Sequence, residues 1–153
     1  MKVPNKNIRR TIIEMISSSN AAHSGSALSL VEILNTVFKN VDLEKIKNND
    51  IDRDRVILSK GHGTAALYAV MHHHGLLDKS LIDTYFKNNT ILAGHTSHHV
   101  PCVEHSTGGL GHGFSVSLGV AIGMRTKKIN SRVYVILGDG EMQEGSNWEA
   151  IML

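Results

Sequence analysis

The stretch that decides the fold is Val133-Tyr134-Val135-Ile136-Leu137-Gly138-Asp139-Gly140, which continues as Glu141-Met142-Gln143-Glu144-Gly145. Its first five residues are apolar or aromatic and rich in β-branched side chains, which predicts a strand over residues 133–137. An apolar run without alternation is typical of a parallel strand covered on both faces. Ligands bind beyond the carboxyl ends of such strands, where glycine admits phosphate oxygens and aspartate ligates Mg²⁺. Gly-Asp-Gly therefore indicates a phosphate and metal site, although the tripeptide alone also fits an ordinary turn.

A second strand, turn and helix precede this stretch. Val56-Ile57-Leu58 is a short apolar run that ends at Ser59-Lys60-Gly61-His62-Gly63, and residues 64–71 then continue as a predicted helix that Gly75 caps. Further helices are predicted over residues 7–19, 29–38, 80–87 and 114–125, and from Ser146 onward. Ser29 and Glu32 have the spacing of a capping box at the start of the second of these helices. Strands that alternate with helices predict an α/β fold with a parallel sheet.

The segments between these elements are polar or rich in glycine. Residues 45–54 are predicted to be a surface connection, and residues 90–113 a loop rich in glycine and histidine. Gly119 and Gly123 lie four apart in the predicted helix over 114–125. Because each glycine costs a helix about 1 kcal/mol relative to alanine, we expect them to pack closely against another backbone.

Composition excludes several classes of protein. The 153 residues suffice for one domain, and 16 basic against 14 acidic residues give no basic surface that would indicate a nucleic-acid partner. No apolar run is long enough to cross a membrane, and residues 1–7 are polar, unlike a secretory signal. Cys102, the one cysteine of the sequence, forms no disulfide within the chain and is compatible with a reducing environment. We therefore expect a cytoplasmic protein in which Cys102 has no function.

Five segments, in the same order along the chain, resemble motifs of the transketolase family. They are Ala22-His23-Ser24-Gly25, Leu58-Ser59-Lys60-Gly61-His62-Gly63, Ala93-Gly94-His95, Ser106-Thr107-Gly108-Gly109-Leu110-Gly111-His112-Gly113 and the stretch over residues 133–145. The residues of these segments most resemble the N-terminal subunit of transketolases that are made as two subunits. The resemblance implies that residues 1–153 are the N-terminal part of the domain that holds the diphosphate side of thiamine diphosphate. It also implies an incomplete three-layer fold with a mostly parallel sheet flanked by helices.

The resemblance implies a role for each matching residue. His23, His62 and His95 correspond to catalytic histidines around the reacting carbon of the cofactor, and His62 also to a diphosphate contact. Gly138 and Gly140 correspond to phosphate contacts, and Asp139 to a ligand of Mg²⁺. The backbone at Gly108 and Leu110 corresponds to contacts with the aminopyrimidine ring. Glu144 corresponds to a buried glutamate at the subunit interface between two cofactor sites.

The implied reaction is transfer of a two-carbon ketol unit from a ketose to an aldose, usually as sugar phosphates. In the family, further Mg²⁺ ligands and the remaining strands of the domain follow after the position of Leu153. A pyrimidine-binding domain or subunit supplies the glutamate that activates the cofactor across an oligomer interface. We therefore expect this chain alone to be inactive, and its last strand to present an unpaired edge that favours aggregation.

Three alternatives stay open at this point. His95, His98, His99, Cys102 and His105 are of the residue types that bind zinc, although their spacing follows no familiar zinc pattern. The chain could also be a noncatalytic remnant or interaction module that binds a transketolase partner. Another thiamine-diphosphate enzyme, such as a 2-oxo-acid dehydrogenase, would share Gly-Asp-Gly but would not require the three histidine segments. His72, His73 and His74 are predicted to be exposed residues at a helix C-terminus, with no role in a site.

Overall fold

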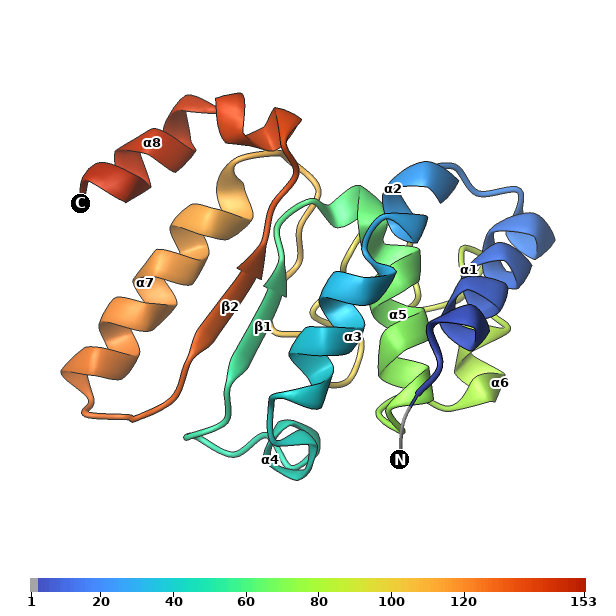
Figure 1. Cartoon of the computed structure of the whole chain (residues 1–153), viewed down its shortest axis with the longest axis horizontal. Coiled ribbons are helices and arrows are strands. Elements are labelled where there is room, and N and C mark those ends of the chain that lie inside the picture. The colour runs from blue at the N-terminus through green and yellow to red at the C-terminus, as the bar shows by residue number, and fades with distance from the viewer. Residues whose placement is uncertain (1–2) are drawn as a thin grey trace.

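Two parallel strands lie at the centre of the fold, and each leads into a short helical turn (Figure 1). The computed structural model describes residues 3–153, so Met1 and Lys2 of the polar N-terminal stretch lie outside the described residues. The elements are α1 (Asn5–Ser19), α2 (Ser24–Leu28), α3 (Val31–Lys39), α4 (Leu43–Lys47), β1 (Arg55–Leu58), η1 (Gly61–Gly63), α5 (Thr64–His73), α6 (Lys79–Ile82), α7 (His112–Thr126), β2 (Val133–Ile136), η2 (Gly140–Gln143) and α8 (Gly145–Met152). The predicted α/β class and both predicted strands are confirmed.

The two strands pair in parallel register, with Arg55 opposite Val133 and Leu58 opposite Ile136. Helix α7 packs against β2, while α1, α3 and α5 lie beyond β1 (Figure 1). All four residues of β1 are buried, whereas β2 is half-buried until Ile136. Within residues 3–153, β2 pairs with β1 alone, so its other edge has no strand partner, as the sequence predicts.

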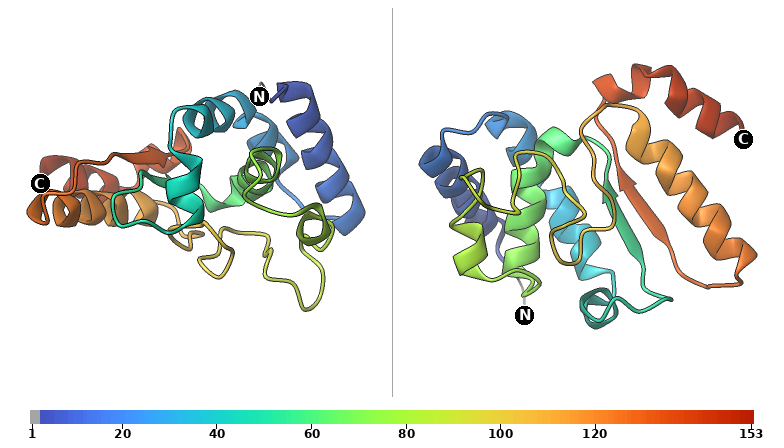
Figure 2. Two further views of the ribbon diagram at one scale, coloured as in Figure 1. Left: turned by 90° about the horizontal axis from the view of Figure 1, so that it is seen from below. Right: turned by 180° about the vertical axis from the view of Figure 1, so that it is seen from behind.

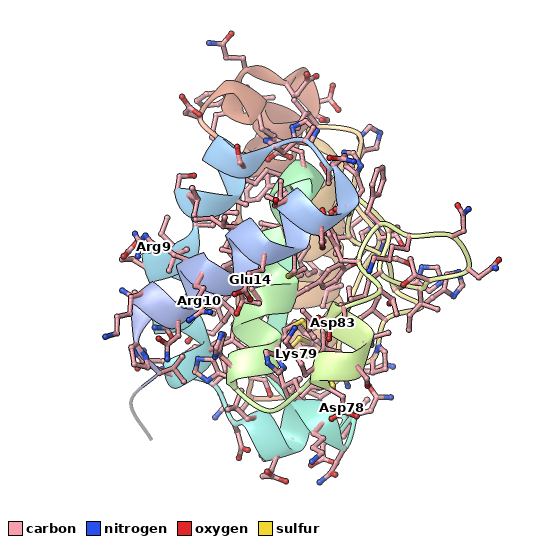
Figure 3. The ribbon with its side chains drawn as sticks, turned by 90° about the vertical axis from the view of Figure 1, so that its right-hand side faces the viewer. Arg9, Arg10, Glu14, Asp78, Lys79 and Asp83 are labelled. Atoms are coloured by element: carbon pink, nitrogen blue, oxygen red, sulfur yellow. The ribbon has the colours of Figure 1, made fainter. Side chains whose placement is uncertain are left out.

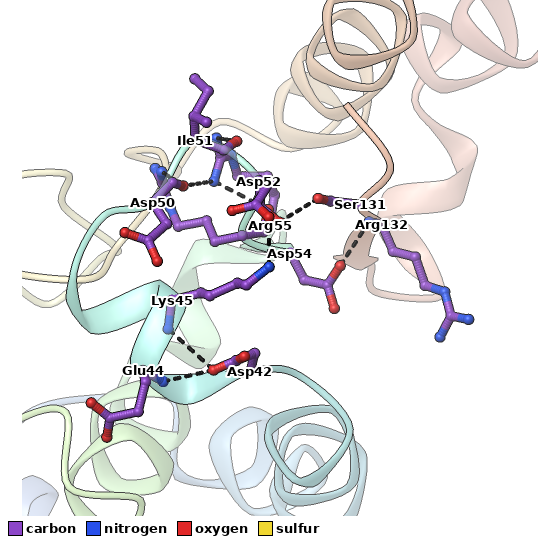
Figure 4. A network of polar contacts seen from close by, with 11 residues as sticks. Asp42, Glu44, Lys45, Asp50, Ile51, Asp52, Asp54, Arg55, Ser131 and Arg132 are labelled. Carbon is purple, nitrogen blue, oxygen red and sulfur yellow. Dashed lines mark hydrogen bonds and ion pairs between the residues drawn. The ribbon is translucent and has the colours of Figure 1, made fainter. Parts of the chain in front are cut away.

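A polar network sets this register at the amino ends of the strands (Figure 4). The Arg132 amide donates a hydrogen bond to the Asp54 carboxylate at 2.7 Å, and the Arg55 amide donates to the Arg132 carbonyl at 2.8 Å. Lys45 of α4 forms an ion pair with Asp52 at 2.5 Å. Residues 45–54 are therefore not a plain surface connection, because their first residues complete α4 and the rest hold the two strands together.

The helices on the β1 side pack through buried apolar side chains. Ile8, Ile12 and Met15 form one buried stripe on α1, and it faces α5. Helix α5 is buried from Thr64 to Met71, as expected for a helix surrounded by other elements. Gly75 follows α5 with φ of 78°, a left-handed conformation that glycine adopts without strain, so the predicted cap is confirmed.

The connection between α6 and α7 crosses the side of α5 and β1 that faces away in Figure 1, and it rises to the carboxyl ends of the strands (Figure 2, right). Its last part is tied to β1 by the Thr107 hydroxyl, which donates to the Leu58 carbonyl at 2.7 Å. The predicted loop over residues 90–113 is confirmed as far as Gly111, after which α7 begins. The long loop thus reaches the sheet edge where the sequence predicts ligands.

Three predictions about local structure are wrong. The predicted capping box fails because Ser29 donates to the Ser26 carbonyl instead, and Glu32 pairs with Arg9 of α1 at 2.7 Å. The predicted helix over 80–87 is only the short α6. Gly119 and Gly123 do not pack against another backbone, since a Cβ added at either would meet nothing within 4 Å in the described chain.

The histidines at the end of α5 are also not the exposed residues that the sequence predicts. His73 exchanges a hydrogen bond of 2.9 Å with the Thr11 hydroxyl, and His74 one of 2.9 Å with the Asn35 side chain. His72 contacts the Leu77 carbonyl at 2.9 Å. Burial lowers the pKa of both His73 and His74 below the ordinary value for histidine. His73 and His74 therefore join the end of α5 to α1 and α3, and His72 bonds to the segment that follows α5.

The outer face of α1 and α6 carries ion pairs that contribute little. Figure 3 shows Arg10 and Glu14 on α1, which are 2.8 Å apart, and Lys79 of α6 paired with Asp83 directly after that helix. These side chains are at least half exposed, and such pairs contribute at most about 1 kcal/mol. No helix of residues 3–153 is long and apolar enough to span a membrane.

A matched pair of glycines in α7 tests this packing. A Cβ at Gly113 would lie 2.7 Å from the Ser59 Cα, so we expect Gly113→Ala to lower the free energy of unfolding by about 1–3 kcal/mol. Gly119→Ala meets no neighbour and is expected to raise it by up to about 1 kcal/mol. Urea unfolding of the purified protein measures both. If Gly119→Ala were destabilising instead, another surface would cover Gly119, as the sequence predicts.

Candidate active site

Three histidines from distant parts of the sequence meet beyond the carboxyl ends of the strands. The His23 ring lies 5.4 Å from the His62 ring and 6.0 Å from the His95 ring, measured between centroids. His23 directly precedes α2 with φ of 72°, His62 lies in η1 after β1, and the His95 carbonyl accepts a hydrogen bond from Tyr68 at 3.4 Å. The structure therefore brings together the three histidines that the sequence predicts.

The cluster is open to solvent. His23 and His95 are exposed and His62 is half-buried. Beside them lies a cavity of about 90 Å³, lined by Ala21, Ala22, His23, Tyr85, Phe86, Gly94 and His95. Burial raises the pKa of Tyr85 to about 12, so its phenol stays protonated at neutral pH. The arrangement offers several rings that can exchange protons and hydrogen bonds with a polar ligand.

His62 has the most perturbed environment of the three. Burial lowers its pKa below the ordinary value, and the nearby charge of Lys60 lowers it further. Because the folded pKa lies below the unfolded one, the unfolded chain takes up the proton first as the pH falls. His62 therefore weakens the folded state below about pH 6.5 and not above it.

The lowered pKa of His62 can be tested directly. We expect its ring to titrate below pH 6.5 in a histidine NMR titration, and Lys60→Met to move the titration upward because a positive charge is removed. Lys127→Met serves as the control, because Lys127 is an exposed lysine at the C-terminal end of α7. A His62 pKa above 6.5, or one that ignores the charge at residue 60, would contradict this account.

The glycine-rich loop passes directly beside the histidines. A Cβ built on Gly108 would lie 3.7 Å from the His95 ring, and one on Gly61 would lie 2.7 Å from the Thr107 carbonyl oxygen. Leu110 is 37% exposed, so its side chain is accessible from solvent. Gly111 has φ of 80° where the loop enters α7. The predicted backbone positions Gly108 and Leu110 thus lie in the segment that reaches the sheet edge.

The Gly138-Asp139-Gly140 turn follows β2 at the same edge. Asp139 is exposed, and its carboxylate does not cap η2. A Cβ on Gly140 would meet nothing within 4 Å in the described chain. The turn is thus open enough for a phosphate to approach its backbone closely.

Lys60 lies beside this turn and is a candidate phosphate contact that sequence reasoning missed. A Cβ on Gly138 would lie 3.7 Å from the Lys60 Cδ, so the lysine stem runs along the turn. Its position just before the predicted His62 was the available signal, since a cation beside a predicted phosphate site is itself a candidate contact.

A diphosphate fits these residues, because the turn offers an open backbone and Lys60 offers a cation. A magnesium ion fits only if Asp139 is one of several ligands. Within residues 3–153, no group of three His, Cys, Asp or Glu side chains converges to hold a metal. Octahedral Mg²⁺ would need oxygens from the diphosphate and from outside the described residues.

The two glutamates of the motif lie in opposite environments. Glu144, predicted from the resemblance to be buried at an interface, is exposed in this chain and precedes α8 without capping it through its side chain. Glu141, for which the sequence predicted no role, is only 2% exposed. Its carboxylate accepts hydrogen bonds from the Ser59 hydroxyl and from the backbone amides of Gly111 and Gly138.

The residues of the zinc hypothesis form no metal-binding group within residues 3–153. The His98 and His99 rings lie 4.1 Å apart, but His98 is engaged with the Ser106 hydroxyl at 2.6 Å. The group of three ligands that zinc would need is not found within residues 3–153. Cys102 lines a cavity of about 370 Å³ together with His98, His99 and part of α4, and burial raises the pKa of its thiol. The structure thus gives the zinc hypothesis no support.

Comparison with known proteins shows the family to which the chain belongs. Residues 2–153 match the family described as Transketolase, thiamine diphosphate binding domain. An apulose-4-phosphate transketolase subunit from Phocaeicola vulgatus is 36% identical over 147 residues, which are 94% of this chain and 52% of that protein. The 6-deoxy-6-sulfo-D-fructose transketolase subunit SqwG of Clostridium sp. (strain MSTE9) is 35% identical over 147 residues, 95% of this chain and 54% of that protein.

A solved structure shares the fold. The Pichia stipitis transketolase in complex with sedoheptulose 7-phosphate superposes with a TM-score of 0.84 at 29% identity, covering 95% of this chain and 23% of that one. Two parallel strands flanked by helices, with glycine-rich turns after the strands, define the class as an α/β domain. The chain belongs to the transketolase family of thiamine-diphosphate-binding domains. It spans about half the length of the two subunits just named.

Proposed function

We propose that this chain forms the diphosphate side of a transketolase active site, which transfers a two-carbon ketol unit from a ketose to an aldose. One observation carries the proposal: three histidines, a glycine-rich loop and the Gly-Asp-Gly turn converge at one edge of the sheet. Acceptance of a ketol unit needs proton exchange at hydroxyl and carbonyl oxygens, and histidine is suited to this near neutral pH. Thiamine diphosphate, when bound, supplies the carbanion chemistry.

The residues of this chain bind the substrate and the diphosphate and transfer protons. His23, His62 and His95 bind substrate hydroxyls and move protons to and from them, and His62 also contacts the diphosphate. Peptide groups at Gly138 and Gly140, together with the ammonium of Lys60, offset the diphosphate charge. In this proposal Asp139 holds Mg²⁺, which neutralises the same phosphates.

Two further contacts lie at the margins of the site. The backbone of Gly108 and Leu110 meets the aminopyrimidine ring, in a loop that already passes beside His95. Glu144 meets a second protomer. Its exposure in this chain supports that role, because an exposed carboxylate is free to be covered by a partner.

The proposal includes partners. We infer that residues 1–153 act as the N-terminal part of a longer diphosphate-binding domain, paired with a pyrimidine-binding subunit or domain in a homo-oligomeric enzyme. Two relatives named as transketolase subunits support a separate partner chain. Their names include a sugar phosphate and a sulfosugar, which supports phosphorylated or similarly anionic sugars as substrates here. The lone cysteine supports a reducing, cytoplasmic location.

Calorimetry tests the proposal. Titration of thiamine diphosphate with Mg²⁺ into residues 1–153 alone should show little or no binding, because Asp139 is one ligand of an octahedral ion. The complete domain with its pyrimidine-binding partner should bind the cofactor and transfer ketol units between sugar phosphates. Micromolar affinity of the short chain would contradict the account of an incomplete site. A complete assembly that binds no cofactor would contradict the proposed function and favour a noncatalytic interaction module.

A further inference from the structure

Glu141 joins the three backbone segments that form the cofactor edge of the site. The Ser59 hydroxyl donates to its Oε1 at 2.5 Å, and the Gly111 amide donates to the same oxygen at 3.0 Å. The Gly138 amide donates to Oε2 at 3.1 Å. These donors come from the end of β1, the glycine-rich loop and the turn after β2. One carboxylate therefore binds residues that lie as far as 82 positions away from it in the sequence.

The Glu141 backbone is fixed as well. Its carbonyl accepts a hydrogen bond of 2.6 Å from the side chain of Asn147, which is fully buried. One of the three donors is closely packed, because a Cβ at Gly113 would lie 2.6 Å from the Ser59 hydroxyl oxygen. Hydrogen bonds therefore fix both the carboxylate and the backbone carbonyl of Glu141.

Burial of this carboxylate is costly unless its hydrogen bonds are kept. A buried carboxylate needs donors for its lone pairs, and a buried amide without an acceptor costs about 1–3 kcal/mol. Each donor of Glu141 precedes or follows a residue of the proposed site: Ser59 precedes Lys60, Gly111 follows Leu110, and Gly138 precedes Asp139. The position of the carboxylate therefore sets the positions of these neighbours.

We propose that Glu141 is a positioning residue that holds the glycine-rich loop and the Gly-Asp-Gly turn in their binding arrangement before the cofactor arrives. It does not touch the reacting atoms. Without it, both segments would have to be ordered by the cofactor itself, and that ordering cost would appear as weaker binding. This inference rests on the proposed function, since it concerns the affinity of the same site.

The test uses Glu141→Gln in the complete enzyme with its partner. Glutamine has the same shape but offers one carbonyl oxygen, so it cannot accept from both Gly111 and Gly138 in the present geometry. We expect the Kd for thiamine diphosphate at fixed Mg²⁺ to rise at least tenfold. Ser59→Ala removes one donor and leaves both amide bonds, so we expect a rise of no more than about threefold.

A second readout does not depend on activity. In the cofactor-free wild-type enzyme, the amides of Gly111 and Gly138 should be protected from hydrogen exchange because both are bonded to Glu141. Glu141→Gln should lose protection at one or both of these amides, and saturating cofactor should restore it. A residue that only stabilised the fold would change the melting temperature without this local, cofactor-reversible signal.

The outcomes separate this inference from the proposed function. If wild type binds thiamine diphosphate and Glu141→Gln binds it within twofold, the inference is overturned and the proposed function stands. Fast exchange of Gly111 and Gly138 in cofactor-free wild type also overturns it, and that measurement needs no variant. If the complete wild-type assembly binds no cofactor, the proposed function fails and the inference fails with it.

Discussion

Asp139→Ala, placed in the complete enzyme with its pyrimidine-binding partner, is expected to abolish retention of thiamine diphosphate. Asp139 is the exposed carboxylate at the turn after β2, and within residues 3–153 no cluster of other side chains stands ready to replace it as a metal ligand. Loss of a charged ligand to Mg²⁺ should weaken cofactor binding at least about 100-fold, which is about 2.8 kcal/mol. Calorimetric titration at fixed Mg²⁺ measures the change.

The fold should survive this substitution. Asp139 does not cap η2 through its side chain, so alanine breaks no capping bond. Asp54→Ala provides a matched control at the opposite end of the sheet, where the carboxylate bonds to the Arg132 amide. That variant is expected to lose about 1 kcal/mol of stability and to keep its cofactor affinity. Cofactor retained by Asp139→Ala would show that Asp139 is not a necessary ligand.

Local signals in the sequence were enough to predict the parts of the fold that bear the site. The run over residues 133–137 became β2 because consecutive apolar residues favour a buried strand, and the glycines after it forced a turn. The shorter run before His62 became β1 for the same reason. Two parallel strands end at one edge, so segments that follow them must meet there. The convergence of His62 with the Gly-Asp-Gly turn was therefore predictable.

Contacts between distant residues were not predictable in this way. Ser29 and Glu32 have the spacing of a capping box, but the glutamate pairs with Arg9, 23 residues away, and the helix begins after Leu30. His74 was expected to be exposed at a helix end, yet it bonds to Asn35, 39 residues away. In each case a tertiary partner outcompeted the local interpretation, and no spacing in the sequence reveals such a partner.

Glu141 shows the same limit inside the motif itself. The motif holds two glutamates three residues apart, and their order gives no sign of which one is buried. The choice depends on η2, which turns Glu141 toward the amides of Gly111 and Gly138 and leaves Glu144 exposed. One physical signal was available: backbone amides that surround a glycine-rich turn need acceptors, and an acid within the turn can supply them.

The histidine cluster carries the second large expected effect. His62→Ala in the complete enzyme should lower kcat by about 10²–10⁴-fold at saturating cofactor, the range for loss of a group that transfers protons. We expect the largest loss at His62, because its ring is half-buried and burial together with Lys60 keeps it neutral below its ordinary pKa. His99→Ala removes an exposed ring from the same long loop and should leave kcat within twofold.

Double substitution decides whether the rings act together. The centroids of His23 and His95 lie 6.0 Å apart, close enough for both rings to contact one substrate. If they bind the same substrate, the combined loss in kcat/KM for His23→Ala and His95→Ala should be smaller than the product of the single losses, since removing either disturbs the pose that the other needs. Losses that multiply would show independent sites. If His23→Ala, His62→Ala and His95→Ala each kept a normal kcat, other groups would transfer the protons. The cluster would then have at most a role in binding.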